Sequence, residues 1–190
     1  MKLWDISKEL LTAPVYPGDP APQLQTISDT RLGDPFTVSV LSCCVHAGTH
    51  ADASLHSFSE GEDVASLPLD VLCGECVVLS HEGVLLGEDV ERMQSRLLPR
   101  VLLRGNVELS QSAAFVLSDA GVRLVGVENN SVANASSSAK VHRQLLGSGM
   151  ILLENLDLSA VRDGRYFLFA APLKIAGAEA APLRAVLVER

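Results

Sequence analysis

The sequence has few aromatic residues, an excess of acidic over basic residues and no long apolar run, and each shortage excludes a class of protein. Aromatic residues make up only 4% of the chain, too few for a surface that stacks single-stranded nucleic acid. The formal net charge of −8 disfavours the clustered lysine and arginine that bind phosphate backbones. No apolar segment reaches the roughly 18 residues of a membrane-spanning helix. We therefore expect no nucleic-acid partner and no membrane insertion.

The beginning of the sequence lacks the apolar core of a secretory signal, which favours a cytoplasmic protein. Cys73 and Cys76 have the spacing of half a zinc knuckle. The other pair, Cys43 and Cys44, are adjacent and would point to opposite faces of a strand, which suits neither a shared metal nor a disulfide. We therefore predict four free cysteines that pack within strands, in a reducing compartment.

A chain of 190 residues that is 47% hydrophobic can bury a core without a disulfide or a structural metal. Hydrophobic periodicity predicts strands over residues 3–6, 36–45, 71–80, 101–104, 122–127, 150–153, 166–171 and 184–188, and helices over residues 88–98, 110–120 and 139–146. Three prolines and a glycine make residues 13–20 an ordered loop, and residues 66–70 read as a turn. The alternation predicts one strand-rich, mixed α/β domain spanning residues 1–190.

Four residues that can bind metals lie within one segment of eleven residues. They are His46, His50, Asp52 and His56, in a chain with only five histidines. Neutral imidazole and carboxylate suit zinc, and also manganese or iron. A histidine on its own, such as His81 in a polar turn, is better explained as an ordinary surface residue. The clustering of the other four favours a metal site or a catalytic site.

His46 and His50 have the spacing that places two ligands on one face of a helix. Gly48 and Thr49 between them are poor helix formers, so we expect a loop at the end of the strand predicted over residues 36–45. Gly48 would allow a tight turn there, and Thr49 would fix a ligand carboxylate or ring nitrogen by a hydrogen bond.

The segment 46–56 resembles the H-x-G-T-H-x-D-x-P-x-H motif of the cyclase family, which includes bacterial kynurenine formamidases and isatin hydrolases. Further similarity covers nearly the whole chain, at residues 5–7, 16–20, 126–131, 153–156, 171–173 and 182–185. The resemblance implies the swivelling β/β/α fold of that family and a homodimer or homotetramer.

The same resemblance implies two divalent metal ions, zinc or alternatively manganese. The ligands that it implies are His46, His50, Asp52, His142 and Glu154. Asp52 would bridge the two ions, and His56, free of metal, would be the general acid and base. Glu154 also has an argument of its own, because it follows an apolar strand where an unpaired buried carboxylate would be costly.

These groups together suit the hydrolysis of an amide. Paired cations lower the pKa of bound water and polarise a carbonyl oxygen, and a histidine can carry the proton to the leaving nitrogen. By resemblance, the expected activity is that of an arylformamidase acting on N-formylkynurenine or a similar small aryl formamide, which releases formate and an amine. Tyr16 would form an aromatic wall for this substrate, although it could equally pack the loop.

The sequence departs from the family pattern at several positions. Ser54 replaces the usual proline, which would loosen the loop that aims His56. Glu128 begins a Glu-Asn-Asn segment in place of Asp-Thr-Pro, and residues 178–181 lack the aspartate typical of kynurenine formamidases. Two alternatives therefore stay open: a hydrolase of another cyclic amide or lactone, similar to isatin hydrolase, or a metal-retaining binding protein without turnover.

Overall fold

A nine-stranded sheet forms the centre of the computed structural model, which describes residues 1–189. In chain order its strands are β1 (Lys2–Asp5), β4 (His50–Asp52), β5 (Cys73–Ser80), β7 (Arg100–Arg104), β9 (Leu124–Val127), β10 (Ile151–Glu154), β11 (Gly164–Phe169), β12 (Ala180–Pro182) and β13 (Val186–Glu189). Their order across the sheet is β1-β13-β11-β5-β7-β9-β10-β4-β12. The middle strands β5, β7, β9 and β10 are parallel, and the strands outside them are antiparallel to their neighbours. This arrangement is the strand-rich, mixed α/β domain that the sequence predicts.

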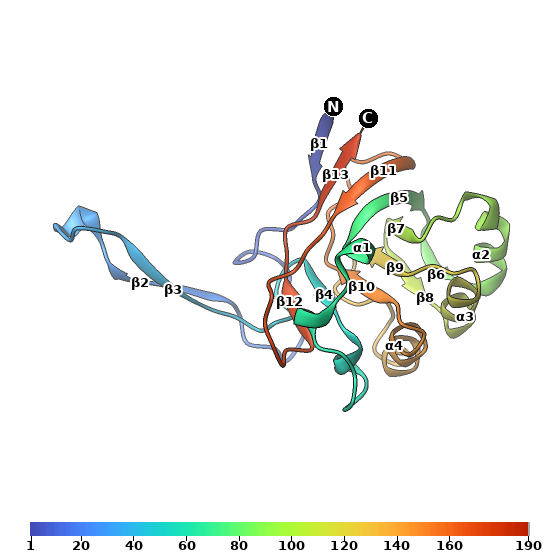
Figure 1. The fold of residues 1–190 in the computed structure, drawn as a ribbon, viewed down its shortest axis with the longest axis horizontal. Helices are drawn as coiled ribbons and strands as arrows, with labels where there is room; N and C mark the ends of the chain where they lie inside the picture. Colours follow the sequence, from blue (N-terminus) through green and yellow to red (C-terminus); the bar gives the residue numbers. More distant parts are fainter. Residues whose placement is uncertain (190) are drawn as a thin grey trace.

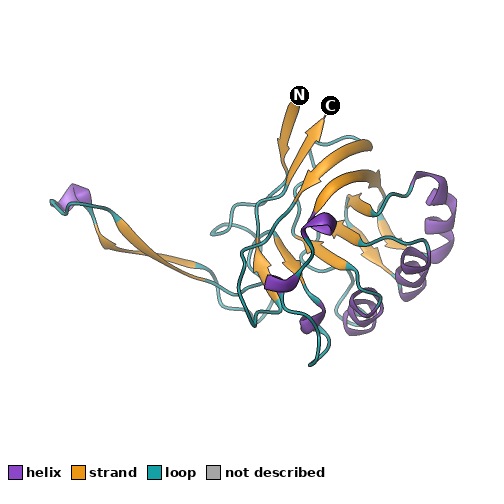
Figure 2. Ribbon diagram, viewed as in Figure 1, coloured by secondary structure: helices purple, strands orange, loops and turns teal. Residues whose placement is uncertain are grey.

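Three helices cover one face of the sheet (Figure 2). They are α2 (Gly87–Met93), α3 (Gln111–Asp119) and α4 (Ser138–Gly147), and each connects two parallel strands. Ser110 caps α3 as predicted, because its hydroxyl accepts a hydrogen bond from the N–H of Ala113 at 3.1 Å. On β5, Val77 and Leu79 pack with the helices, whereas Val78 packs in the core on the opposite face. The middle strands are therefore apolar on both faces, which is why they read as continuous hydrophobic runs.

Shorter elements complete the described fold. They are the parallel pair β6 (Gly83–Leu85) and β8 (Val107–Leu109), the helix α1 (Leu69–Leu72), and 3-10 turns at Ser54–His56, Val64–Ser66 and Gln94–Arg96. The sequence missed β6, β8 and β12, because strands of three residues are too short to show a period. The predicted turn over 66–70 runs into α1, and the helix predicted over 88–98 is α2 followed by one 3-10 turn.

A hairpin arm projects away from the sheet and helices (Figure 1). It consists of β2 (Gln23–Ser28) and β3 (Val38–Ser42), with a 3-10 turn at Thr30–Leu32 near its tip. The sequence predicted a strand with one buried face over residues 36–45, and this prediction is wrong in two respects. The strand is shorter, and all five of its residues are exposed. Its alternating pattern is that of a covered strand, but no other part of residues 1–189 covers the arm.

The four cysteines are free, as predicted. Cys73 and Cys76 lie in β5, and Cys76 is fully buried there. Cys43 and Cys44 lie in the irregular segment between β3 and the turn at residues 45–46 rather than in a strand, and the Cys44 thiol donates to Asp19 Oδ2 at 3.6 Å. This contact joins the two chain segments at the base of the arm. Within residues 1–189, no helix has the length and apolar character needed to cross a membrane.

Candidate metal centre

Two of the predicted ligands lie on a strand rather than in the expected loop. His50 and Asp52 are the first and last residues of β4, so both side chains point to the same face of the sheet. Glu154, at the carboxyl end of β10, is paired with His50 across the two strands. The prediction of a loop over His46 to His50 is wrong for His50, because Gly48, with φ of +63°, completes the turn before it. Only His46 lies in the turn itself.

The five predicted ligands meet in one cluster. His46 Nδ1 is 3.1 Å from Asp52 Oδ1, and His50 Nε2 is 3.5 Å from the same oxygen. On the other side, His50 Nε2 is 3.4 Å from Glu154 Oε2. His142 Nε2, delivered by α4, is 3.3 Å from Glu154 Oε1 and 3.9 Å from Asp52 Oδ2. Residues separated by more than a hundred positions in the sequence therefore converge on the Asp52 carboxylate.

Three buried atoms in this cluster lack hydrogen-bond partners within the described chain: His50 Nε2 and both carboxylate oxygens of Asp52. They approach neighbouring polar atoms, but not with hydrogen-bond geometry. Leaving such atoms unpaired costs roughly 1–3 kcal/mol each, and more for charged groups. Converging, unpaired nitrogen and oxygen atoms are the donor set that a divalent cation would satisfy. The residues present therefore fit the implied metal.

The imidazole tautomers also suit metal binding. His50 Nδ1 is 2.9 Å from the carbonyl oxygen of Gly48, and His142 Nδ1 is 2.9 Å from that of Ser138. A carbonyl oxygen can only accept, so each Nδ1 carries the proton and, in a neutral ring, Nε2 keeps its lone pair. Histidines that bind metals typically donate their other ring N–H in this way. In both rings Nε2 faces the carboxylates: that of His50 has no hydrogen-bond partner in the described chain, and that of His142 contacts Glu154 Oε1 at 3.3 Å.

Two sets of three ligand atoms lie within 4.8 Å of one another, and Asp52 belongs to both. One set is His46, Asp52 and His56, and the other is His50, Asp52 and Glu154. A carboxylate shared by two sets is the geometry expected of a bridging ligand. Because the first set includes His56, the position of His56 is compatible with binding metal as well as with carrying a proton.

The histidines and carboxylates of this cluster shift one another's pKa values. Burial lowers the pKa of His50, but the nearby Glu154 and Asp52 carboxylates outweigh it and raise that pKa to about 9. The pKa values of His46 and His142 are raised by the same balance. Burial raises the pKa of Asp52, yet the adjacent His46 and His50 hold it below its ordinary value. The histidines and carboxylates of this cluster therefore stabilise one another's charged forms.

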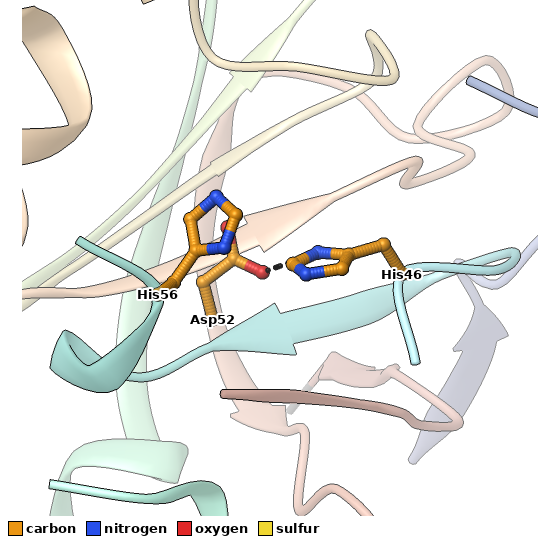
Figure 3. Close-up of side chains that lie close together, drawn as sticks. All are labelled: His46, Asp52 and His56. Carbon is orange, nitrogen blue, oxygen red and sulfur yellow. Dashed lines mark ion pairs between the residues drawn. The ribbon is translucent and has the colours of Figure 1, made fainter. Parts of the chain in front are cut away.

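His56 differs from the other histidines. Burial and the neighbouring His46 and His142 lower the pKa of His56, although Asp52 opposes this shift. Figure 3 shows its ring above the Asp52 carboxylate, with the ring of His46 on the other side. The ring centroids of His56 and His46 are 4.5 Å apart, and those of His56 and His142 are 5.4 Å apart. Near neutral pH, His56 is therefore uncharged and able to accept a proton.

The departures from the family motif have defined structural roles. The Ser54 hydroxyl accepts the N–H of Glu62 at 2.8 Å, which ties down the loop that carries the predicted acid and base. Ser54 therefore anchors this loop instead of loosening it. The carboxylate of Glu128 accepts the N–H groups of Gly105 and Leu158, at 2.6 and 2.8 Å. Its charge is used to hold backbone segments together.

The cluster opens into a cavity of about 270 Å³. Tyr16 lies in its wall, where the sequence predicted a substrate contact, together with Asp19 and Asn130. The sequence analysis missed these last two residues, and it also missed Glu179, whose Oε1 is 3.4 Å from His46 Nε2. In the sequence, the segment 178–181 that contains Glu179 is notable only for lacking an aspartate. Its own position beside β12, the neighbour of β4, brings it to His46.

Comparison with known proteins places this geometry in a family. The profile of the Cyclase family matches residues 4–134. Kynurenine formamidase of Delftia acidovorans (strain DSM 14801 / SPH-1) is 37% identical, over 98% of this chain and 97% of that protein. A solved "potential metal-dependent hydrolase with cyclase activity" superposes with a TM-score of 0.86 at 29% identity, over 100% of this chain and 98% of that one. Isatin hydrolase A of Labrenzia aggregata, at 22% identity, shares the fold, with a TM-score of 0.86 over 100% of this chain and 94% of that one.

Proposed function

The chain belongs to the cyclase family, and from this premise we propose that it is a metal-dependent arylformamidase. It would hydrolyse the C–N bond of N-formylkynurenine, or of a similar small aryl formamide, to formate and the amine. One observation carries the metal dependence: the buried, unpaired His50 Nε2 and Asp52 carboxylate face one another beside a cavity. The full-length similarity to a kynurenine formamidase supports the substrate class.

The proposed centre holds two divalent ions, zinc or alternatively manganese. Its ligands would be His46, His50, Asp52, His142 and Glu154, with Asp52 shared between the ions. Bound cations of this kind supply a water of lowered pKa and polarise the amide carbonyl. The Nδ1 contacts of His50 and His142 support their assignment, because Nδ1 bonds to a backbone carbonyl while Nε2 faces the carboxylates of the site.

We assign the proton transfers to His56. Its lowered pKa keeps the ring neutral near pH 7, so that it can accept the proton of the attacking water. The same ring can then return that proton to the leaving amine nitrogen. Tyr16 would form an aromatic wall of the substrate cavity.

The test is to load the protein with zinc or manganese and measure kcat/KM for N-formylkynurenine, isatin and a simple aryl lactone. A clear preference for the formamide, with release of formate, would support the proposal. A preference for isatin or the lactone would favour the alternative hydrolase instead. Retention of metal with no turnover of any substrate would favour a binding protein.

We also propose that the protein is a cytoplasmic homodimer, or a homotetramer built from such dimers. Leu24 and Leu41 face each other on the arm, and they remain 56% and 47% exposed. An isolated two-stranded hairpin is marginally stable in water, so a second subunit is the simplest cover for it. Four free thiols are compatible with a reducing compartment. Light scattering of the wild type and of Leu24→Glu tests the assembly, since the variant should dissociate and a monomeric wild type would contradict it.

A further inference from the structure

A second cavity adjoins the one at the metal centre. Its volume is about 530 Å³, larger than the 270 Å³ of the first. Tyr16, Asn130 and Ser131 line both cavities and so form their common wall. A ligand whose reactive group lies beside the predicted histidines can therefore extend past Asn130 into the larger space.

One carboxylate oxygen in the larger cavity is available for a ligand. Glu108, on β8, lines this cavity, and its Oε2 accepts the side-chain N–H of Asn134 at 3.1 Å. Among residues 1–189, Oε1 of the same carboxylate accepts no hydrogen bond. Asn129, in the same wall, is fixed by donating to the carbonyl of Val107 at 3.0 Å. The free oxygen on an oriented carboxylate suits a cationic donor such as an ammonium group.

The same cavity also presents one cation. The half-buried Lys8 Nζ donates to the carbonyl of Glu128 at 2.6 Å and lies 3.5 Å from Asn155 Oδ1. An ammonium group has three donors, so one remains for a ligand. The Glu128 carboxylate, the other acid of this cavity, is held by backbone N–H groups on Gly105 and Leu158. Lys8 therefore keeps a charge and a donor that an anionic group can use.

We propose that the larger cavity binds the α-amino-acid end of the substrate, with its ammonium on Glu108 and its carboxylate on Lys8. The aryl ring would pass between Tyr16 and Asn130, and the formamide would lie beside His56. This inference rests on the proposed function and narrows it: the preferred substrates are aryl formamides that carry a zwitterionic side chain. Glu108 and Lys8 are then specificity determinants and take no part in the chemical step.

Two substrates with the same reactive group distinguish a role in binding the amino-acid end from a general loss of activity. N-formylkynurenine carries the amino-acid end, whereas 2-formamidoacetophenone has the same ring, ketone and formamide without it. In Glu108→Gln, the ratio of kcat/KM for the first substrate to that for the second should fall roughly 10-fold, mainly through KM, because one charge-assisted hydrogen bond is weakened. Lys8→Gln should lower the same ratio. Glu91→Gln, at an exposed position on α2, is the matched control and should leave the ratio unchanged.

An unchanged ratio in both cavity variants would overturn the proposal, as would an equal loss with both substrates. The proposed function fails separately, if the metal-loaded wild type hydrolyses neither formamide. In that event, calorimetric titration with L-kynurenine still tests the cavity. Glu108→Gln should raise its Kd roughly 10-fold, whereas equal affinity in wild type and variant, or binding in neither, would overturn the assignment.

Discussion

The hydroxyl of Thr49 donates a hydrogen bond of 2.5 Å to the backbone carbonyl of Asn155. These two residues are the chain neighbours of His50 and Glu154, so the bond joins β4 to β10 at the point where each strand carries a proposed ligand. The same hydroxyl accepts the N–H of Lys8 at 2.9 Å, and Asn155 has a φ of +58°. Thr49 was expected to fix a ligand directly, but it fixes the backbone beside one.

Replacing Thr49 by valine should weaken metal binding. Thr49 is only 2% exposed, and valine has nearly the same shape, but it leaves the Asn155 carbonyl and the Lys8 N–H without the hydroxyl that bonds to both. We expect a loss of about 1–3 kcal/mol in the free energy of unfolding and roughly 10–100-fold weaker metal binding. Urea unfolding and a metal-competition titration measure the two effects. Thr49→Ser keeps the hydroxyl and should restore both, and a serine variant as defective as valine would refute this role.

His56 and Asp52, two of the three members of the first set, should respond differently to substitution by alanine. His56→Ala should retain metal and lose roughly 10²–10⁴-fold in kcat, because it removes the group that carries the proton. Asp52→Ala should instead lose metal, since it deletes the shared carboxylate and leaves the repulsion between the cations uncompensated. Metal content by mass spectrometry, measured beside kcat, distinguishes them. If both variants are equally empty of metal, His56 is a ligand and another group carries the proton.

The stability of the metal-free protein should fall as the pH rises from 6.5 to about 9. The ordinary pKa of a histidine is 6.5, and carboxylate neighbours raise that of His50 to about 9 in the folded state. A raised pKa means that the folded state holds the proton more tightly, so its stabilisation is complete below pH 6.5 and is lost on passing pH 9. The raised pKa values of His46 and His142 act in the same direction. Urea unfolding in a chelator across this range tests the prediction, and rising stability would contradict it.

Removing the metal should abolish activity without unfolding the protein. The core on both faces of the sheet is built from apolar side chains, so folding does not depend on the cation. A metal that binds the folded state and not the unfolded state nevertheless stabilises it by mass action, so chelation should lower Tm. Far-ultraviolet circular dichroism with a thermal scan, before and after chelation, measures both. Full activity in the metal-free protein would exclude the proposed mechanism.

The sequence predicted which side chains meet in the cluster better than it predicted the backbone that carries them. Residues 46–56 carry three histidines and an aspartate, so their chemistry is visible in the sequence itself. The strand β4 is not visible, because its three residues, His50 to Asp52, include two polar side chains that are buried in the cluster of histidines and carboxylates. Glu179 reaches His46 only through the pairing of β12 with β4, which is a non-local contact. The central parallel strands were predictable because a short, continuous apolar run between two helices is typical of a strand that is buried on both faces.

The arm was mispredicted for a different physical reason. Alternation in residues 36–45 reports that one face of a strand is suited to burial, but it does not say which molecule supplies the cover. In the arm, the apolar side chains of β2 and β3 are paired with each other and remain open to solvent. The larger cavity was equally hidden, because Lys8 and Glu108 are a hundred residues apart in the chain.

The base of the arm lies at the candidate site. The chain enters it just after Asp19, in the cavity wall, and leaves it just before His46, a proposed ligand. The contact of the Cys44 thiol with Asp19 joins these two segments at the base of the arm. A displacement of the tip of the arm, near Leu32, would therefore act on the cavity wall at Asp19 and on the segment that carries His46. A molecule bound to the arm would in this way influence the geometry of the site.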